Sequence, residues 1–447
     1  MAKTAQRPPA PRALIELQIN WRRTSDLTPY ARNPRTHSAH QIAQIAASIE
    51  RFGFTNPVLV DDAGGIIAGH GRVAAAKSLG LAEVPTLRLS HLTEAERRAY
   101  IIADNRLAET AGWDAEILAI ELEALIELDF EIELTGFEIA EVDRLIEGRR
   151  DPTDSDAAAD QVPEPPAGPP QTRPGDLWRL GRNWLLCGDA QVADNVARVM
   201  QGEAADLIFT DPPYNVPVDG HITGKGRHRH GEFAFASGEM DPVAFTAFLK
   251  ETLGNAASIC RDGAVAFVCM DWRHMGELLH AGGGVFTELK NLCVWNKTNA
   301  GMGTFYRSKH ELVFVFKVGT APHTNAFRLG ETGRYRTNVW DYAGANTFGA
   351  DRDQALSMHP TVKPVAMIAD AIRDCTRRGE RVLDVFGGSG STLIAAERTG
   401  RRAHLLEFEP SYCDVILGRY LKLTGDIPVQ AHTGRAFESK ALLEAES

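Results

Sequence analysis

The sequence predicts an α/β domain with a mostly parallel sheet, preceded by a smaller α+β domain. Three observations support this prediction. Apolar segments after residue 177 are continuous rather than alternating, a glycine-rich turn follows one of them, and a proline-rich segment over 148–176 separates them from the N-terminal half. Continuous apolar segments are typical of strands that are buried on both faces, as in sheets covered by helices.

The proline-rich segment divides the chain. It holds seven of the 23 prolines and almost no large apolar residue, so we predict a solvated linker that buries nothing. The predicted parts are an N-terminal domain over 13–110, an acidic helical extension over 111–147, the linker over 148–176 and a C-terminal domain over 177–440.

The charge is unevenly distributed along the chain. The net charge of -11 argues, as a single number, against a partner as anionic as DNA. Residues 109–176 alone carry -15, however, whereas 1–108 carry +5 and 177–447 carry -1. The acidity is therefore local and leaves a DNA partner open.

The cysteine pattern and the hydropathy indicate the compartment. The six cysteines show no C-x-x-C spacing, which favours neither a zinc site nor a disulfide framework. No apolar run approaches the roughly 18 residues of a membrane span, and the first twelve residues lack the apolar centre of an export signal. We expect a cytoplasmic protein without a membrane partner.

The N-terminal half alternates helices and strands. Apolar spacing predicts a helix over 38–51, which Gly53 ends, and short strands over 57–60 and 65–68. The turn Gly69-His70-Gly71-Arg72 leads into a predicted helix over 73–79, a strand containing Pro85 follows, and another helix covers 93–108. Residues 114–147 read as two helices, of which the one with an apolar stripe between Ile117 and Ile126 has its carboxylates on a solvated outer face, and no helix-turn-helix is predicted.

The C-terminal domain carries the buried strands. We predict them over 205–210, 264–270, 312–318, 381–386 and 403–408. Because ligands of such sheets bind at the carboxyl ends of the strands, the residues that follow them are the candidate site.

A glycine-rich turn follows the strand over 381–386. The residues Gly387-Gly388-Ser389-Gly390-Ser391-Thr392 join it to a helix, so that backbone and helix N-terminus lie open to a ligand. The next strand ends at Glu407, 23 residues beyond Asp384, where a carboxylate is placed to bind ribose hydroxyls. This combination predicts a nucleoside cofactor, and the spacing disfavours NAD.

A second motif follows the strand over 205–210. Asp211-Pro212-Pro213-Tyr214 forms a rigid loop that offers a carboxylate and a carbonyl as acceptors beside an aromatic ring. These groups suit an exocyclic amino group on a flipped base, whose ring would stack on Tyr214.

This motif and its companions resemble the beta class of amino-group DNA methyltransferases over roughly 177–425. The companions are Trp295-Asn296-Lys297, His310-Glu311-Leu312, His359-Pro360-Thr361-Val362-Lys363-Pro364 and the segment from Asp384 to Thr392. The resemblance implies a class I S-adenosylmethionine-dependent methyltransferase fold, Rossmann-like with a permuted motif order. It implies double-stranded DNA as substrate and no metal.

The resemblance also implies residue roles. Asp211, Pro212, Pro213 and Tyr214 would be catalytic. The residues implied to bind S-adenosylmethionine are Asp189, Lys363, Asp384, Phe386, Gly387, Gly388, Ser389, Gly390, Thr392 and Glu407. Because Asp rather than Ser stands at position 211, adenine N6 is the favoured target, and cytosine N4 is the alternative.

DNA contacts are expected from two basic segments of the C-terminal domain. Residues 221–230 form either a flap over phosphates or a solvated loop, and 319–358 lie where the beta class keeps its target-recognition region. The candidate contacts are Lys225, Arg227, Arg229, Arg328, Arg334 and Arg336.

Residues 15–110 resemble the ParB-like N-terminal domain. The resemblance rests on Asn33-Pro34-Arg35, on Ser48-Ile49-Glu50 and on the turn Gly69-His70-Gly71-Arg72. It implies a nucleotide, usually CTP, whose phosphates face Gly69, His70, Gly71 and Arg72. Sulfiredoxins share the fold, but His70 replaces their reactive cysteine. The alternative is a basic docking module for DNA.

One further class of function stays open, a nucleotide-switch protein whose methyltransferase domain is a scaffold without activity. The intact motifs at 211–214 and 387–390 argue against it. A homodimer stays open as an assembly of the chain, and the sequence does not decide the oligomeric state or the presence of an accompanying restriction enzyme.

Overall fold

The structure is a computed structural model of the chain. It describes residues 17–128, 130–148, 159–163, 165, 168–215, 238–298, 305–326, 336–343 and 362–438. The chain forms two compact units, one of Met1–Leu125 with Phe130–Glu138 and one of Ile126–Asp129 with Ile139–Ser447. We describe each unit by itself.

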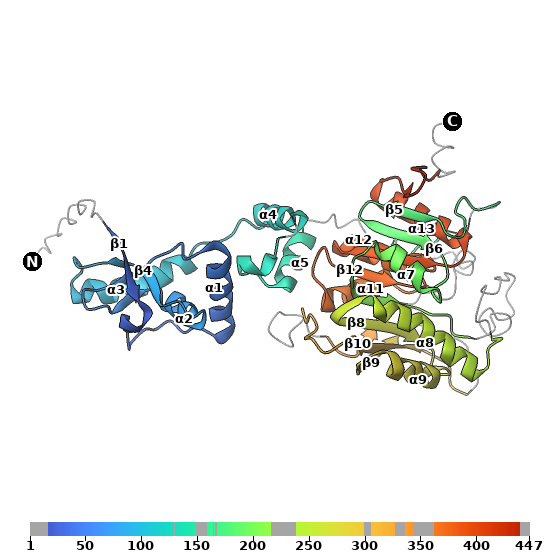
Figure 1. Cartoon of the computed structure of the whole chain (residues 1–447), viewed down its shortest axis with the longest axis horizontal. Coiled ribbons are helices and arrows are strands. Elements are labelled where there is room, and N and C mark those ends of the chain that lie inside the picture. Colours follow the sequence, from blue (N-terminus) through green and yellow to red (C-terminus); the bar gives the residue numbers. More distant parts are fainter. Residues whose placement is uncertain are drawn as a thin grey trace, which may run out of the picture. The chain divides into compact units, whose positions relative to one another are not determined.

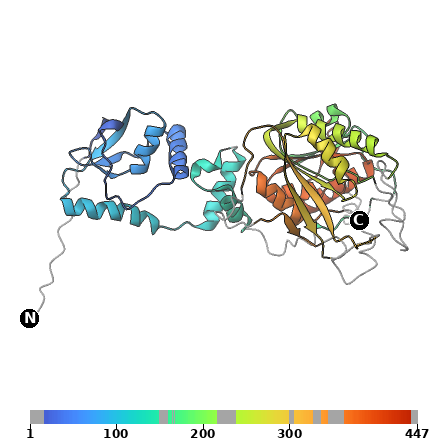
Figure 2. The ribbon, with the colours of Figure 1, turned by 90° about the horizontal axis from the view of Figure 1, so that it is seen from below.

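The N-terminal unit is built on a four-stranded sheet with the order β1-β4-β2-β3. The strands are β1 (Ile19–Arg23), β2 (Val58–Val60), β3 (Ile66–Ala68) and β4 (Glu83–Arg88). The helices are α1 (Ala39–Phe52), α2 (His70–Ser78) and α3 (Glu94–Glu109), and Figure 2 shows the long helix α3 along one side of the unit.

The predicted elements of this unit are confirmed within a few residues, with two differences. Helix α2 begins at His70, three residues before the predicted start, because Gly69 serves as its N-cap. Strand β1 was not predicted. Its side chains are mostly exposed, and it is held by pairing with β4, where Trp21 lies opposite Pro85.

The acidic extension contains α4 (Ala115–Glu127), a short 3-10 helix over Ile132–Thr135 and α5 (Ile139–Glu147). The two predicted helices are confirmed. On the second helix, α5, Asp143 is buried and accepts two hydrogen bonds from the Arg401 guanidinium, over 2.8 and 3.0 Å.

The C-terminal unit holds a ten-stranded sheet with the order β11-β9-β10-β8-β7-β12-β13-β6-β5-β14. The strands are β5 (Leu177–Leu180), β6 (Asn183–Cys187), β7 (Ala205–Thr210), β8 (Cys260–Met270), β9 (Glu288–Asn296), β10 (His310–Lys317), β11 (Val339–Asp341), β12 (Arg381–Asp384), β13 (Arg402–Glu407) and β14 (Val429–Gln430).

All five predicted strands of this unit are present, but one of them runs the other way. Strands β6, β13, β12, β7 and β8 are parallel neighbours, whereas β10 is antiparallel to both β8 and β9. The apolar segment of β10 indicated burial on both faces, which a strand in the middle of a covered sheet has in either direction. Burial alone therefore did not give the strand direction.

Helices cover both faces of this sheet (Figure 1). The core on one face includes residues of α11 (Val365–Cys375), α12 (Ser391–Thr399) and α13 (Pro410–Thr424). The other core includes residues of α7 (Ala193–Met200), α8 (Pro242–Ser258) and α9 (Met275–Val285). Within the described residues, no helix combines the length and the apolar character needed to cross a membrane.

The proline-rich segment is not a solvated linker throughout. Ala159 packs against the core of the C-terminal unit, and Asp160 and Thr172 are buried. Asp414 on α13 accepts hydrogen bonds from the backbone of Gln171 and Thr172. The prediction is wrong at these positions because small and polar residues are buried through hydrogen bonds as well as through apolar area.

Candidate active site

The loop Asp211-Pro212-Pro213-Tyr214 leaves the sheet at the carboxyl end of β7. Strand β7 is buried along its whole length, and its parallel neighbour β12 ends at Asp384. The Thr210 hydroxyl donates to Asp384 Oδ1 over 2.9 Å, which ties the ends of the two strands together. The predicted catalytic loop and the predicted glycine loop therefore start side by side.

Asp211 is held by two donors. The Tyr214 hydroxyl donates to Oδ1 over 2.7 Å, and Lys363 Nζ donates to Oδ2 over 2.6 Å. The Asp211 side chain is 24% exposed whereas that of Lys363 is 4% exposed, so the carboxylate keeps an open edge and its counter-charge does not.

A second carboxylate completes the cluster. Glu311 on β10 lies 3.1 Å from Lys363 Nζ and 3.2 Å from the Tyr214 hydroxyl through Oε2, and Lys297 donates to its Oε1. Lys297 follows the end of β9, which pairs with β10 so that Glu311 lies opposite Trp295. Two carboxylates thus share two ammonium groups.

The protonation of the cluster follows from burial and charge. Burial raises the pKa of Asp211, Lys363 opposes this shift, and Glu311 adds to it. Burial would also raise the pKa of Glu311, but Lys363 and Lys297 lower it to about 2. Burial would lower the pKa of Lys363, but the two carboxylates raise it above its usual value. Lys363 and Glu311 are therefore charged at neutral pH.

Lys363 lies in this cluster rather than on the glycine loop. The family resemblance implied that Lys363 binds the cofactor, whereas its ammonium contacts Asp211 and Glu311. Among the residues without a predicted role, Glu311 and Lys297 stand in the motifs Trp295-Asn296-Lys297 and His310-Glu311-Leu312. These two motifs were the sequence signal for the two residues. Their spacing along the chain did not predict that Lys297 and Glu311 contact each other.

The glycine loop joins β12 to α12 as predicted. Gly390 is the N-cap of α12 with φ +84°, and a Cβ on it would lie 3.0 Å from the Ile416 side chain. Both the left-handed backbone and the contact require glycine at this position. The loop carries Phe386, Gly387, Gly388 and Ser389 in front of the helix.

Two carboxylates flank the loop. Asp384 accepts hydrogen bonds from the Phe386 backbone N–H and the Thr392 hydroxyl. Glu407 ends β13 and accepts from the backbone N–H groups of Gly388 and Glu409, over 2.7 and 2.8 Å. Burial raises the pKa of each carboxylate to about 7.

Asp189 follows the end of β6, which pairs with β13 so that Cys187 lies opposite Glu407. Its carboxylate accepts the Gln191 backbone N–H over 2.9 Å, and the Gly188 N–H donates to the Glu407 carbonyl. The structure thus brings three predicted cofactor residues, Asp189, Asp384 and Glu407, to neighbouring strand ends.

The N-terminal turn is formed as a helix N-terminus. Gly69 has φ +101°, and a Cβ there would lie 3.0 Å from the Arg72 guanidinium, which folds back over the turn. His70 Nε2 accepts the Tyr30 backbone N–H over 3.2 Å, and burial with the nearby His37 lowers the pKa of His70. Burial also lowers the pKa of Arg72, whereas Asp104 raises it.

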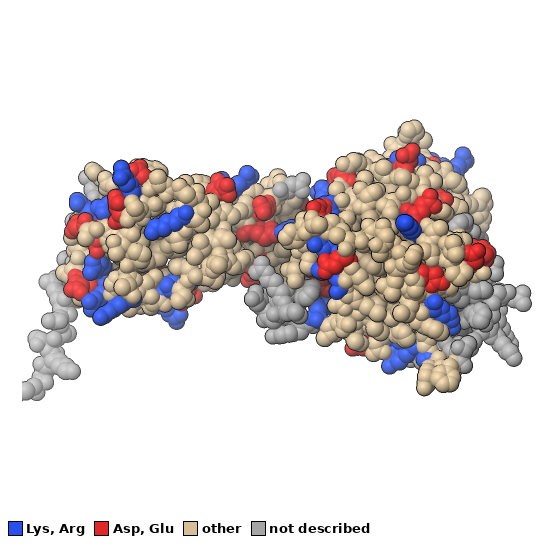
Figure 3. All heavy atoms as spheres, turned by 60° about the horizontal axis from the view of Figure 1, so that its bottom comes forward, with Lys and Arg blue, Asp and Glu red and all other residues tan. Residues whose placement is uncertain are grey.

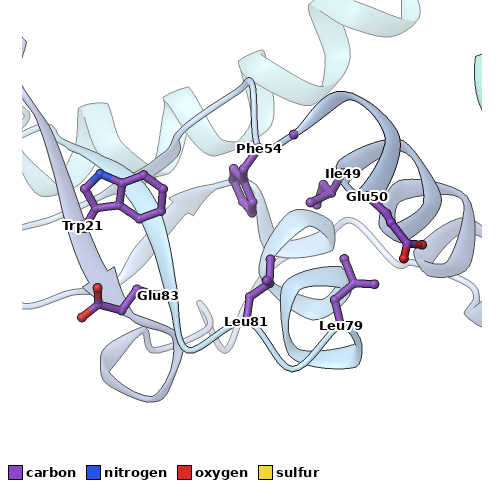
Figure 4. Close-up of a pocket in the computed structure, with 8 residues that line it drawn as sticks. Trp21, Ile49, Glu50, Phe54, Leu79, Leu81 and Glu83 are labelled. Atoms are coloured by element: carbon purple, nitrogen blue, oxygen red, sulfur yellow. The ribbon is translucent and has the colours of Figure 1, made fainter.

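The same unit has a groove of about 390 Å³ that none of these turn residues lines. Figure 4 shows Trp21 from β1, Phe54 and Leu81 around it, with Glu50 and Glu83 at its rim. It is therefore separate from the predicted nucleotide site.

Only one of the predicted DNA contacts lies in the described part of the chain. Lys225, Arg227, Arg229, Arg328 and Arg334 fall outside the described residues. Arg336 pairs with Asp374 over 2.9 Å and Asp370 over 3.4 Å, and donates to the Tyr342 hydroxyl over 3.0 Å. Its guanidinium thus contacts residues of its own domain.

Comparison with known proteins identifies both units. Residues 205–418 match a family described as DNA methylase, with N6 and N4 members, and residues 16–105 match the ParB N-terminal domain. The chain therefore carries an N6/N4 DNA methylase domain together with a ParB N-terminal domain. The methylase match contains the loop at Asp211, the glycine loop and Glu407.

A third match corrects the sequence analysis. Residues 116–174 match the ParB-methyltransferase helix-turn-helix domain. No helix-turn-helix was predicted there, because the acidic composition of α4 and the prolines after α5 hid it. The matched segment includes α5 and the buried residues Asp160 and Thr172.

Individual relatives agree with the domain matches. The chain is 52% identical over 83 residues to the ParB-like nuclease domain-containing protein YnaK of Escherichia coli (strain K12), covering 19% of this chain and 95% of the relative. It is 25% identical over 253 residues to the Type II methyltransferase M.HinfI of Haemophilus influenzae, covering 52% of this chain and 67% of the relative.

M1.HpyAVI is one of the solved structures to which the chain is similar. The crystal structure of the M1.HpyAVI–SAM complex aligns with a TM-score of 0.39 and 18% identity, over 53% of this chain and 97% of that chain.

Proposed function

We propose that this DNA methylase transfers a methyl group from S-adenosylmethionine to the N6 amino group of an adenine flipped out of double-stranded DNA. The proposal rests on the position and the contacts of the Asp211 carboxylate. This carboxylate is partly exposed at the end of β7, beside the glycine loop, and is fixed from behind by Lys363.

The residues of the loop act on the amino group. Its lone pair is delocalised into the ring, which makes the nitrogen a poor nucleophile. Asp211 and the Pro212 carbonyl accept its two hydrogens, which returns electron density to the nitrogen. Each carboxylate oxygen accepts more than one hydrogen bond, so Asp211 accepts the amino group while Lys363 stays in place.

The residues around the glycine loop fit the proposed cofactor. Among the described residues, the buried Ser391 hydroxyl at the start of α12 has no hydrogen-bond partner, and Glu407 presents a carboxylate whose pKa lies near 7. Glu407 would hold the ribose hydroxyls, Asp189 the adenine amino group, and residues 386–390 the methionine part. When bound, S-adenosylmethionine supplies an electrophilic methyl group on a sulfonium.

The proton balance needs no strong base. The methylated nitrogen carries a positive charge and is acidic, so its proton passes to Asp211 or to water. Burial raises the pKa of Asp211, which favours this transfer, and the charge of Lys363 opposes that rise.

Cytosine N4 is the second candidate target. The family has both N6 and N4 members, and the loop geometry suits either amino group. Adenine is preferred because Asp rather than Ser precedes the two prolines at 212 and 213.

The test is substitution of Asp211. For Asp211→Ala we expect methyl transfer from radiolabelled S-adenosylmethionine to DNA to fall at least about 10²-fold, since a fixed acceptor is lost. Binding of S-adenosylmethionine, measured by calorimetry, should stay within about threefold, because Asp211 lies in the loop after β7 and not in the glycine loop. Retained transfer would overturn the catalytic role of Asp211.

We also propose that the ParB domain binds a nucleotide, CTP foremost, at the turn Gly69-His70-Gly71-Arg72. The support is the open N-terminus of α2, with the Arg72 guanidinium folded over it. Titration of CTP into the full chain should give binding that Arg72→Ala weakens at least about tenfold, as expected for a bidentate phosphate contact. No binding by the unmodified chain would exclude the site and leave a docking role on DNA.

A further inference from the structure

A residue outside the methylase match is built into the site. The Asp160 carboxylate accepts the Val365 backbone N–H over 2.7 Å, and both groups are buried. Val365 is the first residue of α11, where Pro364 precedes it and supplies no side-chain cap. Asp160 thus takes the place of a cap, 205 residues away in the chain, and its charge suits a helix N-terminus.

The preceding residue, Ala159, is linked to the glycine loop through Arg419. Arg419 on α13 donates to the Ala159 carbonyl over 2.6 Å and to the Ser389 carbonyl over 2.5 Å. Burial lowers the pKa of Arg419 to about 10, while the charge of Asp160 opposes that shift. One guanidinium therefore connects the segment at 159–160 to the loop that starts α12.

These two contacts lie close in the chain to residues of the candidate active site. Lys363, which holds Asp211, comes two residues before Val365, so the position of its backbone depends on how α11 begins. Ser389 comes one residue before Gly390, the N-cap of α12. The pair Ala159–Asp160 is thus linked to both halves of the active site, through Val365 to Lys363 and through Arg419 to Ser389.

We infer that Asp160, which belongs to the helix-turn-helix match and not to the methylase match, is a positioning residue for methyl transfer. It acts through Lys363 on the acceptor Asp211 and, with Arg419, on the glycine loop. This inference rests on the proposed function. It makes the end of the helix-turn-helix segment a working part of the methylase domain.

The test compares two substitutions at this residue in the full chain. Asp160→Ala removes the acceptor of the Val365 N–H, and we expect the single-turnover methylation rate to fall about tenfold or more, as a misplaced catalytic geometry does. The dissociation constant of S-adenosylmethionine, measured by calorimetry, should rise about threefold or more. Asp160→Asn keeps the acceptor oxygen and should restore the rate to within about threefold of the unmodified chain.

Asp414 on α13 provides a matched control, because it binds a later part of the same proline-rich segment. Asp414 is on the same helix as Arg419. Its carboxylate accepts hydrogen bonds from the backbone N–H groups of Gln171 and Thr172, and not from Val365 or Ser389. Asp414→Ala should lower the melting temperature and leave the methylation rate within about twofold, because it loosens the segment away from the site. Equal rates for Asp160→Ala and Asp414→Ala would overturn the inference, as would failure of Asp160→Asn to restore the rate.

The two proposals fail differently. If the unmodified chain binds S-adenosylmethionine but does not methylate DNA, the proposed function fails, and the cofactor affinities of the Asp160 variants still decide the positioning role. If the unmodified chain methylates DNA and Asp160→Ala does so at the same rate, only the positioning role fails.

Discussion

At the scale of single residues, the site depends on two carboxylates that are paired with two ammonium groups. Asp211 and Glu311 would repel each other in a buried cluster, and Lys363 with Lys297 offsets both. Burial raises the pKa of Asp211 and Lys363 opposes that rise, while the Asp211 side chain stays partly exposed. A carboxylate accepts both in the resting site and with a bound amino group, which a protonated Asp211 does less well.

Glu407 gives a prediction at this scale. Its pKa of about 7 reflects burial, and a ribose diol donates to the ionised form. Binding of S-adenosylmethionine should therefore lower this pKa and release roughly half a proton at pH 7, where such a group is half protonated. Calorimetry in buffers of different ionisation enthalpy measures the release.

The matched variant for this prediction is Glu407→Gln. It keeps an acceptor but cannot ionise, so its binding should be weaker and should release no proton from this position. Proton release that is unchanged in Glu407→Gln would contradict the assignment of the carboxylate to the ribose.

At the scale of elements, α5 is anchored by a buried ion cluster. Asp143 accepts two hydrogen bonds from Arg401, whose side chain is 0% exposed, and lies 3.0 Å from Arg378 Nε. Burial alone would raise the pKa of Asp143, but Arg401 and Arg378 lower it. The pair therefore contributes stability above the usual pKa of an aspartate, and this contribution is lost as the pH falls.

Asp143→Ala should destabilise the C-terminal unit by about 3–5 kcal/mol, because it leaves buried arginines without their counter-charge. Denaturant unfolding of the full chain, followed by tryptophan fluorescence, measures the change. Glu116→Ala on α4, where the side chain is exposed, is the control with an expected change below about 0.5 kcal/mol. Equal effects of the two substitutions would contradict the anchoring role.

The elements also show what the sequence could predict. Strand β7 and the glycine loop have strong local signals, an apolar run and fixed glycines, and both were predicted within a residue or two. The direction of β10, the edge strand β1 and the burial of Asp160 and Asp143 depend on partners far along the chain. Asp143 meets Arg401 at a separation of 258 residues, which no local pattern records.

At the scale of the whole molecule, the net charge of -11 is a poor guide to the partner. Part of the acidity over 109–147 is used internally, since Asp143 and Glu147 pair with Arg401 and Arg373 of the C-terminal unit. Figure 3 shows basic and acidic side chains interspersed on the face that it presents, rather than one large patch of a single sign. The total charge therefore does not argue against DNA as the substrate of the methylase domain.

The most direct test of the central claim is modification-sensitive sequencing of DNA from cells that express the chain or its Asp211→Ala variant. We expect N6-methyladenine at one defined sequence with the unmodified chain and none at that sequence with Asp211→Ala. Methylcytosine at N4 in place of methyladenine would contradict the base preference. No modification with the unmodified chain, or the same modification with Asp211→Ala, would contradict the proposed activity of the site.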